Sequence, residues 1–310
     1  MSHKVHLDTD LGGDMDDLCA LAMLLYWPNV EITGITTVAE SAGRRAGYVH
    51  HVLELEDRSD IPIAAGSDVS SGYYRYPELR YPDDERYWSK KITSVPGELE
   101  NAIQLLKQSI ERAATVISIG PFTNLYLLDL HYPGILQQAK LFLMGGYIYP
   151  IRPGFPNWGN DMDWNIQVDV RSAKHVLENS TPTLIPLSAT VETALQRSCL
   201  DDLRKAGALG RLIAHQAEAF AQDEENEKRF GETCEGLPDD FINFLHDPLA
   251  CAIALGYEQG IETEAVPILV EENDGFLIER VDPTGRVLSL VKKVDGSHFN
   301  EFWLNTLMNR

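Results

Sequence analysis

A dense group of aspartates lies near the start of the chain. The run Leu7-Asp8-Thr9-Asp10-Leu11-Gly12-Gly13-Asp14-Met15-Asp16-Asp17 places five carboxylates within ten residues. Like charges this close repel one another unless a cation offsets them or several side chains point into solvent. Carboxylate oxygens suit Ca²⁺ or Mg²⁺, whereas Zn²⁺ prefers nitrogen and sulfur. The run therefore predicts a divalent-cation site; the alternative is a solvated acidic turn whose aspartates cap a helix.

The elements around this run are expected to hold it at the edge of a sheet. Lys4–Asp8 is predicted to be a short buried strand, and Leu18, Leu21 and Leu25 recur at helical spacing after the aspartates. Negative charge is favourable at a helix N-terminus. The ends of parallel strands are also where open α/β sheets bind ligands. We therefore expect the carboxylates to line a ligand site.

The rest of the chain predicts an α/β fold with a mainly parallel central sheet flanked by helices. Helical segments such as Ala42–Glu56 alternate with further strands, predicted at Glu31–Thr37, Thr115–Ser118, Lys140–Met144 and Thr183–Pro186. Such alternation places helices on both faces of the sheet. No repeat or linker interrupts the pattern, which predicts one domain over residues 1–310.

The C-terminal part departs from that alternation. After about residue 263, Val266–Val270, Phe276–Val281 and Val287–Leu290 are predicted strands joined by turns at Asn273-Asp-Gly and Asp282-Pro-Thr-Gly. They predict a short antiparallel extension, followed by a final helix with Ser297 as its N-cap. Residues 67–97 and 217–240 are predicted long loops, which in compact domains are usually lids or binding loops.

Composition narrows the class of partner. The formal net charge of −21 disfavours nucleic acid, which requires a cationic surface, and leaves a small molecule or a divalent cation. The first residues of the chain contain no apolar signal-peptide core, and no apolar run approaches the 18 residues of a membrane span, so we expect no membrane association. Cys19 and Cys251 lie in apolar helical stretches and are expected to be buried free thiols. These features predict a cytoplasmic protein.

The aspartate run resembles the Asp-x-Asp-Pro-Gly-x-Asp-Asp motif of the inosine-uridine-preferring nucleoside hydrolases. The matching positions are Asp8, Asp10, Gly12, Asp16 and Asp17. The chain has Leu11 where the family usually has Pro, and two extra residues precede the Asp pair. This leaves Asp14 as a surplus carboxylate, and the motif does not decide whether Asp14 replaces Asp16 or Asp17 at a metal.

Further segments carry the resemblance along the whole chain. The segment Asp163-Trp-Asn165-Ile-Gln-Val-Asp169 is similar to the family pattern Glu-Phe-Asn-Ile-x-x-Asp-Pro. The other similar segments are Ile35-Thr-Thr-Val, Pro62-Ile-Ala-Ala-Gly, Ser118-Ile-Gly-Pro-Phe-Thr-Asn124, Leu143-Met-Gly-Gly and Leu245-His-Asp-Pro248.

The resemblance implies a nucleoside-hydrolase-like, Rossmann-related fold and a calcium site. Its ligands would be Asp10, Asp17, Asp247 and the carbonyl of Ile119, an all-oxygen set suited to Ca²⁺. Asp10 would also act as general base toward a water molecule. Attack at the anomeric carbon, through an oxocarbenium-like state, would release ribose and a free base. The family likeness further implies a homodimer or homotetramer.

The same resemblance assigns residues to the sugar and the leaving group. Asp16, Asp163 and Asn165 would hold sugar hydroxyls. Both Asn157 and Asn160 match a further family asparagine, and the choice between them stays open. Ser41 stands near the position of another family asparagine. His246 would protonate the leaving base or merely pack beside the metal site.

The leaving group itself is not indicated by the sequence. A group of aromatic side chains, in or close to the predicted loop, would stack on a flat base or hold that loop against the body. They are Tyr73, Tyr74, Tyr76, Tyr81, Tyr87 and Trp88.

Two alternative functions follow from the same residues. A haloacid-dehalogenase-type phosphatase also begins with Asp-x-Asp, uses the first Asp as nucleophile and requires Mg²⁺. Its pattern has Thr or Val where this chain has Gly12, and it gives His246 and Asp247 no role. A non-hydrolysing relative that keeps the calcium site as a ribose-binding protein is the other alternative.

Overall fold

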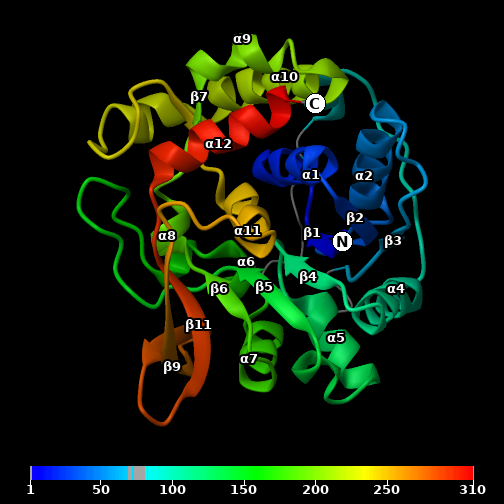
Figure 1. The fold of residues 1–310 in the computed structure, drawn as a ribbon, viewed down its shortest axis with the longest axis vertical. Coiled ribbons are helices and arrows are strands. Elements are labelled where there is room, and N and C mark those ends of the chain that lie inside the picture. Colours follow the sequence, from blue (N-terminus) through cyan, green and yellow to red (C-terminus); the bar gives the residue numbers. More distant parts are fainter. Residues whose placement is uncertain (1, 69–71, 73–80, 82, 310) are drawn as a thin grey trace.

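The computed structural model describes residues 2–68, 72, 81 and 83–309. Within this part of the chain, nine strands form one sheet in the order β10-β9-β11-β6-β5-β4-β1-β2-β3 (Figure 1). The strands are β1 (His3–Thr9), β2 (Val30–Thr37), β3 (Ile63–Ala65), β4 (Thr115–Ser118), β5 (Lys140–Met144), β6 (Thr183–Ile185), β9 (Glu262–Asn273), β10 (Phe276–Val281) and β11 (Arg286–Lys293). All neighbours from β3 to β11 pair in parallel, and β9 pairs antiparallel with β11 and β10. The predicted mainly parallel sheet with an antiparallel C-terminal part is confirmed.

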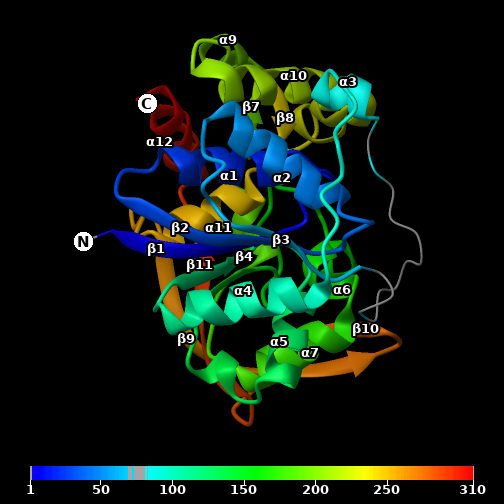
Figure 2. The same cartoon turned by 90° about the vertical axis from the view of Figure 1, so that its right-hand side faces the viewer.

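Helices cover both faces of this sheet (Figure 2). One face carries α1 (Asp16–Tyr26), α2 (Arg44–Leu55) and α11 (His246–Ala254), and the other carries α4 (Leu99–Glu111), α5 (Thr123–His131) and α7 (Val170–Asn179). Outside the first group lie α9 (Leu200–Leu203), α10 (Gly207–Glu224) and α12 (Gly296–Met308). The shorter elements are α3 (Asp84–Trp88), α6 (Trp164–Gln167), α8 (Leu187–Thr190), three 3₁₀ turns (Ile135–Gln137, Asn160–Met162, Arg197–Cys199), a π-helical turn (Glu227–Gly231) and the pair β7 (Leu195–Gln196) and β8 (Phe241–Asn243).

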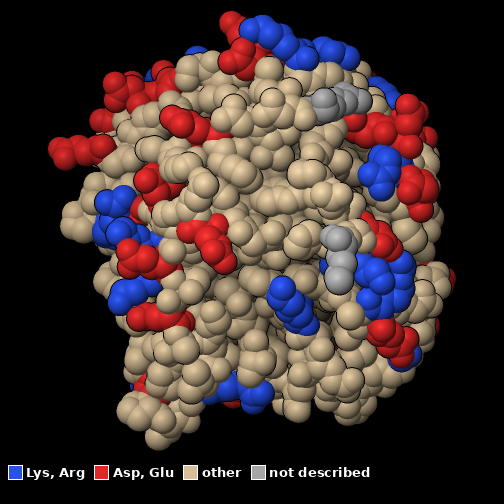
Figure 3. Space-filling model, viewed as in Figure 1, with Lys and Arg blue, Asp and Glu red and all other residues tan. Residues whose placement is uncertain are grey.

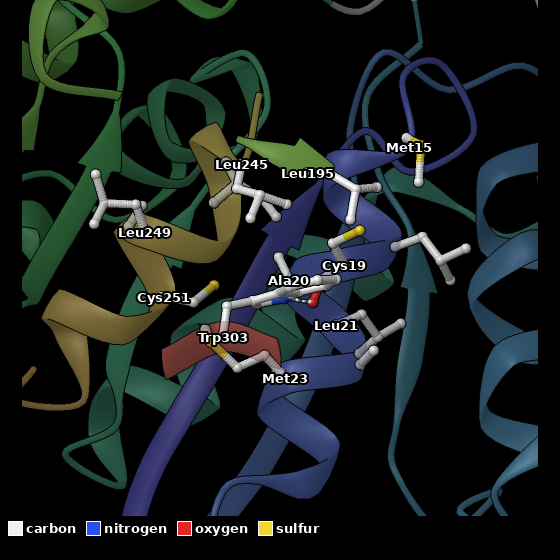
Figure 4. Close-up of a cluster of buried hydrophobic side chains, with 14 of the residues drawn as sticks. Met15, Cys19, Ala20, Leu21, Met23, Leu195, Leu245, Leu249, Cys251 and Trp303 are labelled. Carbon is white, nitrogen blue, oxygen red and sulfur yellow. Dashed lines mark hydrogen bonds between the residues drawn. The ribbon is translucent and has the colours of Figure 1, made fainter. Parts of the chain in front are cut away.

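The core beneath α1 shows why the first helix is fixed against the sheet. Residues 16–24 of α1 are all buried, so this helix is enclosed on every side rather than amphipathic. Trp303 of α12 lies against it, and its indole N–H donates to the carbonyl of Cys19 at 3.3 Å (Figure 4). Cys19 and Cys251 are buried free thiols, as predicted. The N-terminus of α1, with its aspartates, is therefore held at a fixed place.

Most predicted boundaries agree with the structure, but two predictions are wrong. Asp295, not Ser297, is the N-cap of α12, and its carboxylate accepts from the His298 N–H at 3.1 Å. The predicted loop at 217–240 begins inside α10, which continues to Glu224 because its alanine-rich inner face is buried. The strand predicted at 266–270 is part of the longer β9.

The charged side chains of the surface are mixed in sign on the face that Figure 3 shows. On the face seen in Figure 3, acidic and basic side chains are interspersed without a continuous basic patch. In the described part of the chain, no helix is both long and apolar enough to cross a membrane.

Candidate active site

A cavity of about 390 Å³ opens at the carboxyl ends of β1, β4 and β5. Its polar lining consists of Asp10, Asp14, Asp16, Asp17, Arg45, Asp163, Asn165, His246 and Asp247. Its remaining lining consists of Gly13, Ile119, Met144, Trp158, Met162, Trp164 and Leu187. Carboxylates from the two ends of the sequence thus meet in one cavity.

Three of these carboxylates converge closely enough to share a cation. Among the described residues, Asp16, Asp17 and Asp247 each offer one oxygen, and these atoms lie within 4.8 Å of one another. All three side chains are buried, and their pKa values are raised well above the usual range, first by burial and then by repulsion from the other carboxylates of the cavity, which include Asp10 and Asp14. A hard divalent cation would offset that repulsion, and an all-oxygen donor set fits such an ion.

The structure arranges the expected metal ligands in one cavity but not in one cluster. Asp17 and Asp247 belong to the three-carboxylate group together with Asp16, which the sequence analysis had assigned to the sugar. Asp10 and Ile119 line the same cavity outside that group. Asp14 also faces the cavity, where it accepts from the Asn243 side chain, and burial raises its pKa to about 6.

Asp10 lies between three neighbours that restrict its carboxylate. Its Oδ2 accepts from the indole Nε1 of Trp164 at 3.2 Å. A Cβ at Gly120 would lie 2.8 Å from Oδ1, so this close approach requires glycine. Burial raises the pKa of Asp10, and the nearby positive charge of Arg45 opposes that rise.

Asn165 and Asp163 organise the wall that follows β5. Asn165 donates through its Nδ2 to the carbonyls of Ile119 at 2.9 Å and Met144 at 3.1 Å. Asp163 caps α6 by accepting from the Ile166 N–H at 3.2 Å, and it also accepts from the Gly146 N–H. Burial raises the pKa of Asp163 to about 6.

Three residues expected at the sugar do not line the cavity. Ser41 and Asn157 are exposed. Asn160 donates to the carbonyl of Leu277 on the edge strand β10 at 3.3 Å. Ser41 turns outward because the buried Glu40 beside it binds the N–H groups of Ser41, Arg45 and Ala46 and so fixes the start of α2.

His246 begins α11 and lies on the cavity wall. Its Nδ1 is 2.7 Å from the hydroxyl of Thr190, and its ring stacks on Phe244 with centroids 4.9 Å apart. Burial lowers the pKa of His246 to about 3, so the ring is neutral near pH 7.

Three of the aromatic side chains proposed for base stacking lie in the described part of the chain, and these three make other contacts. Trp88 stacks on Tyr48 with centroids 4.6 Å apart, and the Tyr87 hydroxyl donates to Asp223 at 2.8 Å; neither ring lines the cavity. Tyr81 donates to the carbonyl of Ala39 at 3.0 Å. Tyr73, Tyr74 and Tyr76 lie outside the described residues.

Three large apolar side chains line the cavity although the sequence did not predict a role for them. Trp158, Met162 and Trp164 come from the segment just before and within the Asp163 motif. Their closeness in sequence to that motif is the signal that could have predicted their place in the cavity. Arg45 carried no such signal, because its approach to Asp10 depends on the turn between β2 and α2.

Comparison with known proteins gives the class of this fold and site. The family model for inosine-uridine preferring nucleoside hydrolases matches residues 5–301, and the chain belongs to that family. It is accordingly an N-glycosyl hydrolase of the nucleosidase type.

Individual relatives are distant in sequence and close in fold. The pyrimidine-specific ribonucleoside hydrolase RihA of Salmonella arizonae is 27% identical over 269 residues, covering 82% of this chain and 79% of that protein. The plant nucleoside hydrolase PpNRh1 superposes with a TM-score of 0.80 at 17% identity, with both chains fully covered. The purine-preferring ribonucleoside hydrolase from Gardnerella vaginalis gives a TM-score of 0.80 at 20% identity, covering 99% and 98% of the two chains.

Proposed function

We propose that this protein hydrolyses the N-glycosidic bond of a ribonucleoside or related N-riboside with the aid of Ca²⁺, releasing ribose and the free base. The observation that carries this proposal is the convergence of Asp16, Asp17 and Asp247 beside Asp10 in one cavity. Four buried carboxylates with little compensating charge are unfavourable without a cation. Asp10, Asp17, Asp247 and the Ile119 carbonyl would hold the ion, with Asp16 as a further oxygen donor. Calcium bound there would offset the carboxylate charges and anchor the two ribose hydroxyls.

Asp10 would serve as the general base. Its carboxylate faces the cavity and would accept the proton of the attacking water. The charge of Arg45 favours the ionised form that this role requires. Attack at the anomeric carbon then displaces the base through an oxocarbenium-like state.

The sugar would be held by Asp16, Asp163 and Asn165. Because the Nδ2 of Asn165 already donates to two carbonyls, its Oδ1 is the atom available to accept from a hydroxyl. Asn157, Asn160 and Ser41 would reach a substrate only after a rearrangement of their segments. The homodimer or homotetramer and the cytoplasmic location stay predictions.

The leaving base would lie against the aromatic wall. Trp158 and Trp164 offer flat surfaces for a planar ring. His246 is the polar side chain we assign to protonation of the base, and because its ring is neutral near pH 7 in the free protein, this role requires that substrate binding raise its pKa. His246→Ala should reduce turnover of inosine-like nucleosides more than turnover of p-nitrophenyl riboside, whose leaving group departs as a stable anion. Equal losses on both substrates would assign His246 to packing.

The decisive experiment compares two chromogenic substrates. We expect the protein to cleave p-nitrophenyl riboside, to lose that activity in EDTA and to regain it with Ca²⁺. It should not cleave p-nitrophenyl phosphate. Phosphatase activity that depends on Mg²⁺ would support the haloacid-dehalogenase alternative. Calcium binding without cleavage of any riboside would support the non-hydrolysing alternative.

A further inference from the structure

Trp164 contacts the proposed general base from a distant part of the sequence. Its indole Nε1 donates to Asp10 Oδ2 at 3.2 Å, across 154 positions of the chain. The Trp164 residue is 43% exposed although it lines the cavity. A large, partly exposed ring at this place is not explained by packing alone.

The backbone of Trp164 is fixed on both sides. Asp163, the residue before it, caps α6 through the Ile166 N–H at 3.2 Å. Asn165, the residue after it, binds the carbonyls of Ile119 and Met144. The indole is thus presented to Asp10 from a rigid turn, which is the condition for a reproducible hydrogen-bond direction.

Arg45 supplies charge to Asp10 but not direction. Its Nε donates to the carbonyl of Ala39 at 2.8 Å, and its Nη1 donates to the carbonyl of Leu11 at 3.2 Å. These bonds tie the guanidinium to the backbone. Gly120 closes the space beside Oδ1, where any Cβ would clash. Among the side chains that the structure describes, Trp164 is therefore the one whose hydrogen bond orients the Asp10 carboxylate.

We propose that Trp164 is a positioning residue, whose indole N–H holds one oxygen of Asp10 so that the other is directed at the substrate side of the cavity. This inference rests on the proposed role of Asp10 as base. The similar family pattern has Phe at this position, which would supply the ring but no N–H. Trp164 thus adds a donor that the motif alone does not predict.

Trp164→Phe tests the proposal because it keeps an aromatic wall and removes the donor. We expect kcat to fall about tenfold, as for a modest hydrogen bond to a charged group, with KM changed less than about twofold. The loss should be equal on p-nitrophenyl riboside and on a nucleoside, since the base acts on water in both. Trp27→Phe is the matched control: Trp27 packs edge-on against Phe302, outside the cavity. An unchanged kcat, or a change in KM alone, would overturn the proposal.

A double-mutant comparison separates positioning from packing. In the Asp10→Asn background, adding Trp164→Phe should lower the residual kcat by less than about twofold, because the oriented base is already gone. Additive losses would instead show that Trp164 acts only as part of the cavity wall. Calcium affinity, measured by calorimetry, should stay within about threefold in Trp164→Phe, and a larger loss would make Trp164 a support of the metal site. A wild-type protein without riboside activity would reject both this inference and the proposed function, whereas an active wild type with an unaffected Trp164→Phe rejects only this one.

Discussion

Asp8, Asp16 and Asp17 belong to one short motif, yet their surroundings in the structure are opposite in kind. Asp8 accepts from the Thr36 hydroxyl at 2.6 Å, the Asn124 amide at 2.7 Å and the Ser118 hydroxyl at 3.1 Å. It is fully buried and does not line the cavity. Asp16, Asp17 and Asp247 instead lie against one another, and repulsion raises their pKa values further.

The network around Asp8 continues into the sheet. Because the Thr36 hydroxyl donates to Asp8, it accepts from Nε2 of His6 at 3.0 Å. Nδ1 of His6 then accepts from the Ser109 hydroxyl at 2.8 Å. We call Asp8, Thr36, His6 and Ser109 the Asp8 network. The three donors of Asp8 let its buried carboxylate hold β1, β2 and β4 together, whereas Asp16, Asp17 and Asp247 lie against one another and need a cation to offset their charge.

The contrast also bears on the phosphatase alternative. That reaction requires the first Asp of Asp-x-Asp to attack a phosphorus atom. Asp8 is the first Asp here, and both of its oxygens are occupied by neighbouring donors. The structure therefore disfavours a nucleophilic role for Asp8.

The largest expected effect is on the cavity side. Asp10→Asn keeps the shape and an oxygen atom but cannot accept a proton, so kcat for riboside hydrolysis should fall at least ~10²-fold. Substrate affinity, measured by calorimetry with a slowly hydrolysed riboside, should largely survive. A variant that retains near wild-type turnover would show that another group is the base.

The next largest effect is expected from metal removal, which should involve the cavity carboxylates and not Asp8. Calcium at 100 times its dissociation constant should stabilise the folded protein by roughly 2.7 kcal/mol, so EDTA should lower the melting temperature. Asp247→Asn should reduce this response, and Asp8→Asn should retain it. If calcium does not change the melting temperature of the wild type, the cavity carboxylates bind no cation.

Truncation of Asp8 should cost stability. Asp8→Ala leaves the donors of Thr36, Ser118 and Asn124 without their acceptor, and each buried donor without a hydrogen-bond partner costs stability. We expect a loss of about 2 kcal/mol in the free energy of unfolding in urea, with the calcium response preserved. Loss of the calcium response together with stability would place Asp8 in the metal site.

The last expected effect is a pH dependence of stability in the Asp8 network, and it is small for each pH unit. Burial lowers the pKa of His6 from 6.5 to about 3, so between these values the unfolded chain binds a proton that the folded protein does not. The contribution of His6 to stability should therefore fall as pH is lowered from about 6.5 toward 3, by up to about 1.4 kcal/mol per pH unit. Asp8, whose pKa burial raises from 3.8 to about 6, contributes with the opposite sign between these two values. His6→Gln should flatten that slope. His50→Gln, on a side chain that is 45% exposed, is the matched control and should leave the slope as it is.

The sequence by itself determined the layers of the fold and the place of the site. Hydrophobic period and turn residues predicted β4 and β5 with their observed bounds, because both signals are local. Turn chemistry at Asn273-Asp-Gly likewise marked the β9–β10 hairpin, where Asp274 and Gly275 adopt φ of 50° and 77°. The acidic run predicted where carboxylates would gather.

Only the tertiary structure decided what each polar residue does. Asp8 and Asp10 look alike in the motif, and partners more than a hundred positions away separate them: Ser118 and Asn124 for Asp8, and Trp164 for Asp10. Ser41 points outward because Glu40 accepts from the N–H groups at the start of α2. Asn160 instead donates to a carbonyl of the edge strand β10. Hydrogen-bond partners are set by which strands become neighbours, and that information is absent from local spacing.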